Sequence, residues 1–261
     1  GRRPFESGAA RGSHQDRGNQ GCRLVSSRRR ASPEGGDRSS GAGAAGRRAA
    51  AWRGAGAFLG GPFPGIDVIH GVSYDGQRVW FATGPSLAVL EPESGRLLRS
   101  IEATADAGTA FDGRHLFQIA GDRIRKIDPE TGEVLATIAA PTAGSSGLAW
   151  AEGSLWVGGY RERKIHQVDP DTGRVLRTID SDRFVTGVTW VDGELWHGTW
   201  EQDATELRRI DPETGEVRER LDMPAGIGVS GLESDGNGRF FCGGGPSGKL
   251  RVVRRPGSAA R

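Results

Sequence analysis

The chain of 261 residues contains only two cysteines, Cys22 and Cys242, and no apolar run long enough to cross a membrane. Two such distant cysteines suggest neither a disulfide framework nor the Cys-x-x-Cys spacing of a structural zinc site. No apolar segment of adequate length follows the first arginines, so the sequence as written also lacks a secretory signal. We therefore expect no membrane span, no metal and no cofactor, and we interpret Cys242 as a small buried apolar residue.

Lysine is absent from the first quarter of the chain, where the positive charge comes from arginine alone. Residues 1–65 contain 12 arginines and 4 acidic residues, a net charge of +8, whereas the remaining residues contain 23 basic and 29 acidic residues, a net charge of −6. Residues 1–60 also lack the periodic apolar pattern from which a core is built. We predict a disordered, Arg/Gly-rich basic tail over residues 1–60 and a folded domain over residues 61–256.

The arginine-rich tail raises the question of nucleic acid. Arginines bind phosphate groups, but this tail lacks the interleaved aromatic residues that stack on single strands, and the folded part carries negative charge. We therefore expect neither nucleic acid nor a membrane as partner, and we expect a monomer. The sequence as written fits a cytoplasmic protein, although it begins with Gly1 rather than Met, so export and the natural status of residues 1–60 stay open.

From Ile66 onward, two short motifs recur at nearly constant spacing. The first resembles D-P-x-T-G and recurs after 37, 41 and 42 residues, and within each unit the apolar residues alternate with a period near two, as in β-strands. The first motif occupies residues 91–95, 128–132, 169–173 and 211–215, and the second occupies residues 74–81, 111–118, 150–157, 190–197 and 234–241. Tandem four-stranded units of about 40 residues are typical of propeller blades. The sequence predicts an all-β fold, a five-bladed β-propeller of four-stranded blades.

The first motif has a complete explanation as a turn between the third and fourth strands of a blade. An acidic residue such as Asp128 accepts a backbone hydrogen bond, Pro129 presets its φ angle, and Gly132 supplies the positive φ that returns the chain to the sheet. The aspartates of this motif are therefore predicted to be structural and not catalytic.

Large rings recur once per unit after the second motif, which predicts packing between adjacent blades. These rings belong to Trp80, Phe117, Trp156, Trp196 and Phe240. The fifth unit supplies only three strands before the chain reaches residue 256. We predict that residues near 57–63 supply its missing outer strand.

A ligand site in a propeller is expected at one mouth of the central channel, near the starts of the inner strands and the loops between second and third strands. Residues that break the repeat there are the candidates. His70, His197 and Glu233 are the catalytic candidates, because imidazole and carboxylate groups exchange protons near neutral pH. The ligand-binding candidates are Asp67, His70, Tyr160, Arg161, His197, Trp200, Glu201 and Glu233. No metal spacing, nucleophile triad, phosphate loop or dinucleotide fingerprint accompanies them.

The segments GELWHGTW, LRRIDPETGEV and HGVSYDGQRVWFATG together resemble the glutaminyl-peptide cyclotransferases of the plant and bacterial type. The resemblance implies a five-bladed propeller that converts an N-terminal glutamine to pyroglutamate with loss of ammonia. Trp200 carries over to the family's pattern, whereas Phe81 stands where the family has its proton-transferring glutamate. The family's Phe-Thr-Gln-Gly-Leu and Asn-Glu-Leu-Glu stretches are replaced here by residues 68–72 and 186–189.

Two functional hypotheses follow. The first is a cyclotransferase-like propeller that binds a small molecule or peptide at its channel mouth without catalysis, or with divergent chemistry. The second is an enzyme of the cyclotransferase type that uses His70, His197 or Glu233 in place of the missing glutamate. The sequence leaves the ligand undefined.

Overall fold

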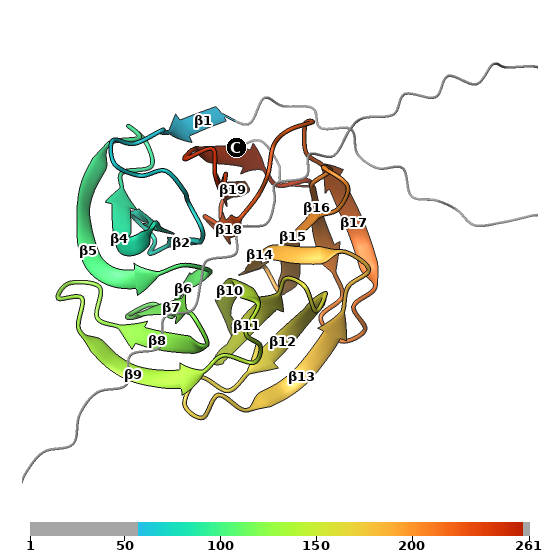
Figure 1. The fold of residues 1–261 in the computed structure, drawn as a ribbon. Helices are drawn as coiled ribbons and strands as arrows, with labels where there is room; N and C mark the ends of the chain where they lie inside the picture. Colours follow the sequence, from blue (N-terminus) through green and yellow to red (C-terminus); the bar gives the residue numbers. More distant parts are fainter. Residues whose placement is uncertain (1–56, 258–261) are drawn as a thin grey trace, which may run out of the picture. The chain divides into compact units, whose positions relative to one another are not determined.

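The computed structural model describes residues 57–257, which lie in the second of two units of the chain, 46–261; the first unit comprises residues 1–45. The described strands form five four-stranded antiparallel sheets around a common centre (Figure 1). This confirms the predicted five-bladed propeller. Within the described range, no helix is long and apolar enough to cross a membrane. The predicted disordered tail comprises residues 1–60, and residues 1–56 of it lie outside the described range.

Each of the first four blades follows the chain from an inner strand to an outer strand. Blade one contains β2 (Val72–Tyr74), β3 (Val79–Ala82), β4 (Gly84–Leu90) and β5 (Leu97–Ala105). Blade two contains β6 (Thr109–Phe111), β7 (Leu116–Ala120), β8 (Arg123–Ile127) and β9 (Val134–Ala139). Blade three contains β10 (Ser145–Ala151), β11 (Ser154–Gly159), β12 (Lys164–Val168) and β13 (Val175–Asp180). Blade four contains β14 (Phe184–Val191), β15 (Glu194–Trp200), β16 (Glu206–Ile210) and β17 (Val217–Asp222).

Blade five joins two distant parts of the chain. Its inner strands are β18 (Gly231–Ser234), β19 (Arg239–Gly243) and β20 (Leu250–Arg254), and its outer strand is β1 (Ala57–Gly60). Gly60 pairs with Leu250 in the antiparallel β1–β20 register. The predicted closing strand is thus confirmed, and the propeller begins at residue 57 and not at 61, because the open edge of β20 is paired by residues assigned to the tail.

A glycine opens the inner strand region of every blade and faces the backbone of the next blade. A Cβ atom added at any of them would lie only 2.4–2.6 Å from the nearest backbone atom of the following blade. The five glycines are Gly71, Gly108, Gly147, Gly187 and Gly231, and we refer to them as the glycine ring. Because real Cβ contacts are longer than this, the inner strands can approach so closely only where the side chain is missing.

Large aromatic rings fill the space between the blades, as the sequence predicted. The five rings named from the repeat are at most 3% exposed. In blade five, however, the cross-strand register places Phe241 opposite Glu233, as Trp80 lies opposite Ser73, whereas Phe240 packs back against Trp196 with ring centroids 5.1 Å apart. The ring of blade five that corresponds to Trp80 is therefore Phe241.

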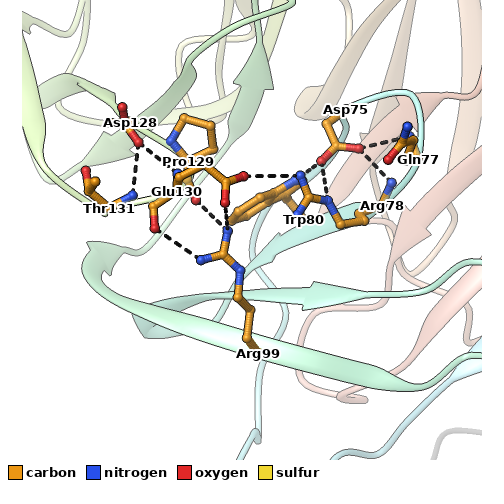
Figure 2. Close-up of polar contacts among 9 residues, drawn as sticks. All are labelled: Asp75, Gln77, Arg78, Trp80, Arg99, Asp128, Pro129, Glu130 and Thr131. Atoms are coloured by element: carbon orange, nitrogen blue, oxygen red, sulfur yellow. Dashed lines mark hydrogen bonds and ion pairs between the residues drawn. The ribbon is translucent and has the colours of Figure 1, made fainter.

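The D-P-E-T-G turn has the predicted local geometry. Asp128 Oδ1 accepts the backbone N–H groups of Glu130 and Thr131 at 2.8 and 2.9 Å, and Gly132 has a φ of +78° (Figure 2). These bonds satisfy the turn's donors and hold the pKa of Asp128 below its usual value. The turn chemistry accounts for the motif without a catalytic role.

The same turn also joins neighbouring blades. Arg99 on β5 of blade one donates to the carbonyl oxygens of Pro129 and Glu130 at 2.7 and 3.3 Å, and its guanidinium lies over the Trp80 ring, 5.5 Å from the centroid (Figure 2). The Trp80 indole N–H donates to Asp75 at 2.7 Å. The buried indole thus has its polar group satisfied while its face supports the arginine.

Replacement of one ring glycine tests the close approach of the inner strands. We expect Gly187→Ala to destabilise the protein by about 1–3 kcal/mol, because the new methyl group would overlap the backbone of blade five. Urea denaturation followed by tryptophan fluorescence measures this change. Gly228→Ala is the matched control, since its Cβ would meet only a Trp200 ring atom at 3.7 Å, and it should shift stability by less than about 0.5 kcal/mol. Equal effects of the two substitutions would contradict the packing constraint.

Candidate functional site

A cavity of about 280 Å³, with several polar residues in its wall, lies beside the starts of the five inner strands. Every blade contributes to its wall. The lining residues are His70, Asp106, Ala107, Gly144, Ser145, Ser146, Tyr160, Thr186 and Ser230. We refer to this cavity as the mouth cavity.

The glycine ring positions the wall of the mouth cavity. The residue immediately before the ring glycine lines the cavity in every blade, and these residues are His70, Ala107, Ser146, Thr186 and Ser230. Four of the five have small side chains, and His70 is the one that differs most from this repeated pattern. This is the physical reason why His70 stands out in the repeat.

Three serine hydroxyls of the wall are committed to backbone carbonyls. Ser146 donates to Gly158 and Val185 at 3.0 and 2.8 Å, Ser145 donates to Thr142 at 2.8 Å, and Ser230 donates to the carbonyl of Ile69. A serine nucleophile needs a base that accepts its proton. Because these protons are directed to carbonyls, the serines fix loops and are not arranged for covalent catalysis.

His70 is half-buried, and its backbone N–H donates to the Ala82 carbonyl at 2.9 Å. Burial lowers the pKa of His70 below the usual 6.5, and the Asp106 carboxylate opposes that shift only in part. The imidazole is therefore neutral at pH 7 and offers one donor and one acceptor nitrogen. Its side chain makes no hydrogen bond to any other described residue, which leaves both nitrogens available to a ligand.

Asp106 is the one acidic residue of the described cavity wall. It is exposed, and both of its carboxylate oxygens accept the backbone N–H of Gly121, at 3.1 and 3.2 Å. No arginine or lysine lines the cavity in this part of the chain. The mouth cavity thus presents negative charge beside a neutral imidazole.

Tyr160 forms an aromatic shelf at one side of the mouth cavity. Its ring stacks on Phe184 with centroids 4.9 Å apart, and the Arg163 guanidinium covers the other side of the shelf, 4.5 Å from the Phe184 centroid. Glu201 pairs with Arg163 at 3.0 Å. Glu201, a predicted ligand-binding residue, therefore neutralises Arg163 and does not line the cavity.

His197 lies away from the mouth cavity, in a second cavity of about 220 Å³ between blades three and four. It is 1% exposed, and burial lowers its pKa to about 4, so the ring is uncharged at neutral pH. Its Nδ1 lies 3.2 Å from the Gly198 carbonyl, which fixes the proton on that nitrogen. The neighbouring Arg208, also 1% exposed, donates to Glu206 at 2.7 Å and to Asp182.

The buried Arg208 is expected to hold blade four to the segment after blade three. We predict that Arg208→Ala costs about 3 kcal/mol, because it leaves the buried Glu206 with Arg183 as its remaining partner at 2.9 Å. Arg218→Ala is the control on the same blade, since its pair with Asp211 is exposed and should contribute less than about 1 kcal/mol. Chemical denaturation of both variants measures the difference. A change of the same size in both would show that burial does not matter here.

Glu233 lies on β18, three residues after Ser230, and does not line the mouth cavity. Its carboxylate accepts hydrogen bonds from Thr189 Oγ1 at 2.6 Å, Ser234 N at 2.8 Å and Ser73 Oγ at 3.3 Å. Burial nevertheless raises the pKa of Glu233 to about 7, against its usual 4.5, because the surrounding protein disfavours the charge more than these bonds favour it.

The pKa of Glu233 predicts a pH dependence of stability. The folded value lies above the unfolded value, so its favourable contribution is complete below pH 4.5 and is lost as the pH rises through about 7. Relative to Glu233→Gln, the wild type should lose on the order of 3 kcal/mol between those limits, at about 1.4 kcal/mol per pH unit. Urea denaturation of both proteins from pH 4 to pH 8 measures the difference. A difference that does not change with pH would exclude this assignment.

Three further candidates do not line the mouth cavity. Asp67 and Arg161 are exposed at other positions of the surface, and Trp200 is half-buried, paired with Phe184 in the β14–β15 register. Of the eight ligand-binding candidates, the cavity wall contains His70 and Tyr160. Sequence reasoning missed the wall residues Asp106, Ser145, Ser146, Thr186 and Ser230. The residue before the inner-strand glycine of each repeat was the signal that would have identified Ser146, Thr186 and Ser230.

Phe81 is fully buried and stacks on Phe63 with centroids 5.3 Å apart, so apolar core occupies this place. The described residues also contain no group of three or more His, Cys, Asp or Glu side chains that is arranged to hold a metal ion.

No protein-family model matches the chain, and no curated protein sequence matches it significantly. Among solved structures, the glutaminyl cyclase of Myxococcus xanthus is similar with a TM-score of 0.61 and 18% identity, over 72% of this chain and 90% of that chain. The WD40 propeller domain of Doa1 is similar with a TM-score of 0.48 and 19% identity, over 71% of this chain and 63% of that chain. At such identities the likeness to the cyclase shows a shared β-propeller fold and not a shared activity.

Proposed function

We propose that the protein binds a small molecule or the end of a peptide, through a free amine, in the mouth cavity, and that it does so without turnover. The observation that carries the proposal is the cavity wall itself, in which an unpaired neutral imidazole and one carboxylate face a space of about 280 Å³. A cavity of this size suits a small ligand or a chain terminus.

The charge of the wall defines the chemical class of the ligand. Asp106 attracts an ammonium group, and His70 supplies one hydrogen-bond donor and one acceptor for the adjoining polar group. The Tyr160–Phe184 shelf offers apolar surface beside them. An amine with a neighbouring amide or hydroxyl matches these three features, as in the first residue of a peptide.

The lack of turnover is inferred from the groups that would move protons. The family resemblance in the sequence aligns the buried Phe81 with the family's glutamate, and the wall serines direct their protons to backbone carbonyls. Binding therefore has support from the wall, whereas general acid-base catalysis would depend on His70 alone.

The alternative is a cyclotransferase, and the similarity in fold to a glutaminyl cyclase favours its consideration. In that reaction the α-amine of an N-terminal glutamine attacks the side-chain carbonyl, and ammonia leaves. The neutral imidazole of His70 would accept a proton from the amine, and the shelf would hold the side chain of the substrate.

A glutaminyl dipeptide separates the two hypotheses. We expect calorimetry to detect binding and a coupled assay to detect no ammonia, with affinity about tenfold weaker for the N-acetylated dipeptide and for Asp106→Asn. Asp222→Asn, an exposed change on the outer strand β17, is the control and should bind as the wild type does. Ammonia release that is lost in His70→Ala would establish the cyclotransferase instead, and undiminished binding by Asp106→Asn would refute the amine subsite.

A further inference from the structure

Glu233 joins three of the five inner strands. It lies on β18 of blade five, and it accepts hydrogen bonds from Thr189 on β14 of blade four and Ser73 on β2 of blade one. The two bonds lead in opposite directions around the ring. One carboxylate therefore links the blades on both sides of blade five.

The corresponding position in the other blades carries a small residue. Each lies opposite the inter-blade ring of its own blade, and these residues are Ser73, Ala110, Ala149 and Thr189. The alanines belong to blades two and three and offer no hydrogen bond. The carboxylate thus acts on blades four, five and one and leaves blades two and three without a matching contact.

The residues tied by Glu233 lie close to the mouth cavity along the chain. His70, Thr186 and Ser230 each precede a member of the hydrogen-bonded set by three residues, on the same three strand segments. Three residues of extended chain span about 10 Å. The glycine ring lies between the cavity residues and the hydrogen-bonded residues, and its backbones are in contact. Because this packing leaves no free space, a shift of one inner strand at Glu233 moves the cavity residue on the same strand.

We propose that Glu233 is a proton-operated positioning residue for the mouth cavity: its carboxylate holds His70, Thr186 and Ser230 in register, and its protonation shifts those three groups relative to blades two and three. Glu233 acts through the strands and touches no ligand. The proposal goes beyond ligand binding, because it concerns the geometry of the empty cavity.

The chemistry of the carboxylate supplies the switch. When ionised, Glu233 only accepts hydrogen bonds, whereas the protonated group also carries one donor. A proton on the oxygen that faces Thr189 or Ser73 is accepted by that hydroxyl, which then turns its own proton away from the carboxyl group. Since the pKa of Glu233 is about 7, both forms are populated near neutral pH.

The other titratable groups near β18 lie on β2, β15 and β19 and in the segment after β18. The strands β14 and β10, which pack against β18, carry no titratable side chain. The pKa of Tyr74 on β2 is raised above 10, that of Cys242 on β19 is about 12 and that of His197 on β15 is about 4. The remaining groups are Asp235, Arg239 and Glu194, which form ion pairs Asp235–Arg239 and Glu194–Arg209. His70 titrates within the mouth cavity itself, below 6.5.

The glycine ring provides its own internal probes and controls for the test. The backbone amides of Gly71, Gly187 and Gly231 lie on or immediately before the tied strands β2, β14 and β18, and those of Gly108 and Gly147 lie immediately before β6 and on β10, which Glu233 does not bond. Nitrogen-15 spectra of the free protein between pH 5 and pH 9 follow all five. We expect a step with a midpoint near 7 at the three tied glycines, at least three times larger than any change at the other two.

Glu233→Gln should abolish this step, and its spectrum at pH 8 should resemble that of the wild type at pH 5 for Gly187 and Gly231. Glu194→Gln, an acid replaced on the neighbouring strand β15, is the matched control and should retain the step. A step of equal size at all five glycines, no step near pH 7, or a step that persists in Glu233→Gln would overturn the proposal. No ligand is used, so the outcome is independent of the dipeptide experiment.

Thr189→Val provides a second variant if Glu233→Gln does not fold. It keeps the volume of Thr189 and removes the hydrogen bond of 2.6 Å to the ionised carboxylate. Loss of a donor to the charged form raises the pKa of the acid. The step should therefore move to higher pH, and an unchanged midpoint would contradict the proposed network.

Discussion

The contact of five backbones at the glycine ring is the constraint on which the other features depend. Because no side chain separates the inner strands there, adjacent blades meet main chain against main chain, and each strand enters the centre at a fixed distance from its neighbours. The residue before each glycine then lines one shared cavity. The mouth cavity is a consequence of this geometry, and its chemistry is set by whichever side chain stands at that one position of the repeat.

Farther from the axis, the blades separate and different contacts hold them. Aromatic rings fill most of the widening gaps, and an arginine on the outer strand can clamp the turn of the next blade, as Arg99 does. Between blades three and four, the buried Arg208 and its carboxylate partners take part of this role. His197, which is remote from the mouth cavity, lies beside this ionic contact, where burial keeps the imidazole neutral.

The sequence predicted the repeated strands and turns of the blades, and it predicted contacts between side chains of different blades less well. Turn chemistry and a period of two defined the blades, and the missing fourth strand of the last unit predicted β1. Gly238 lengthens the turn of blade five, so alignment of the motif letters selected Phe240, while the backbone register selects Phe241. The search for residues that break the repeat found His70 but passed over Ser146, Thr186 and Ser230, which look like scaffold because they recur. The side-chain partners of Glu233, Thr189 and Ser73, come from other blades, and no local sequence pattern predicts them.

Closure of blade five by β1 has a kinetic consequence. The β1–β20 pair joins the two ends of the described range, so it has the greatest sequence separation of the described strand pairs. The strands of each other blade follow one another along the chain, so those blades can form from local hairpins. Blade five is complete only when β20, near the end of the described range, pairs with β1. Folding should thus finish with the pairing of β1 and β20. Until then, β20 is an unpaired edge strand to which a strand of another copy of the chain could add.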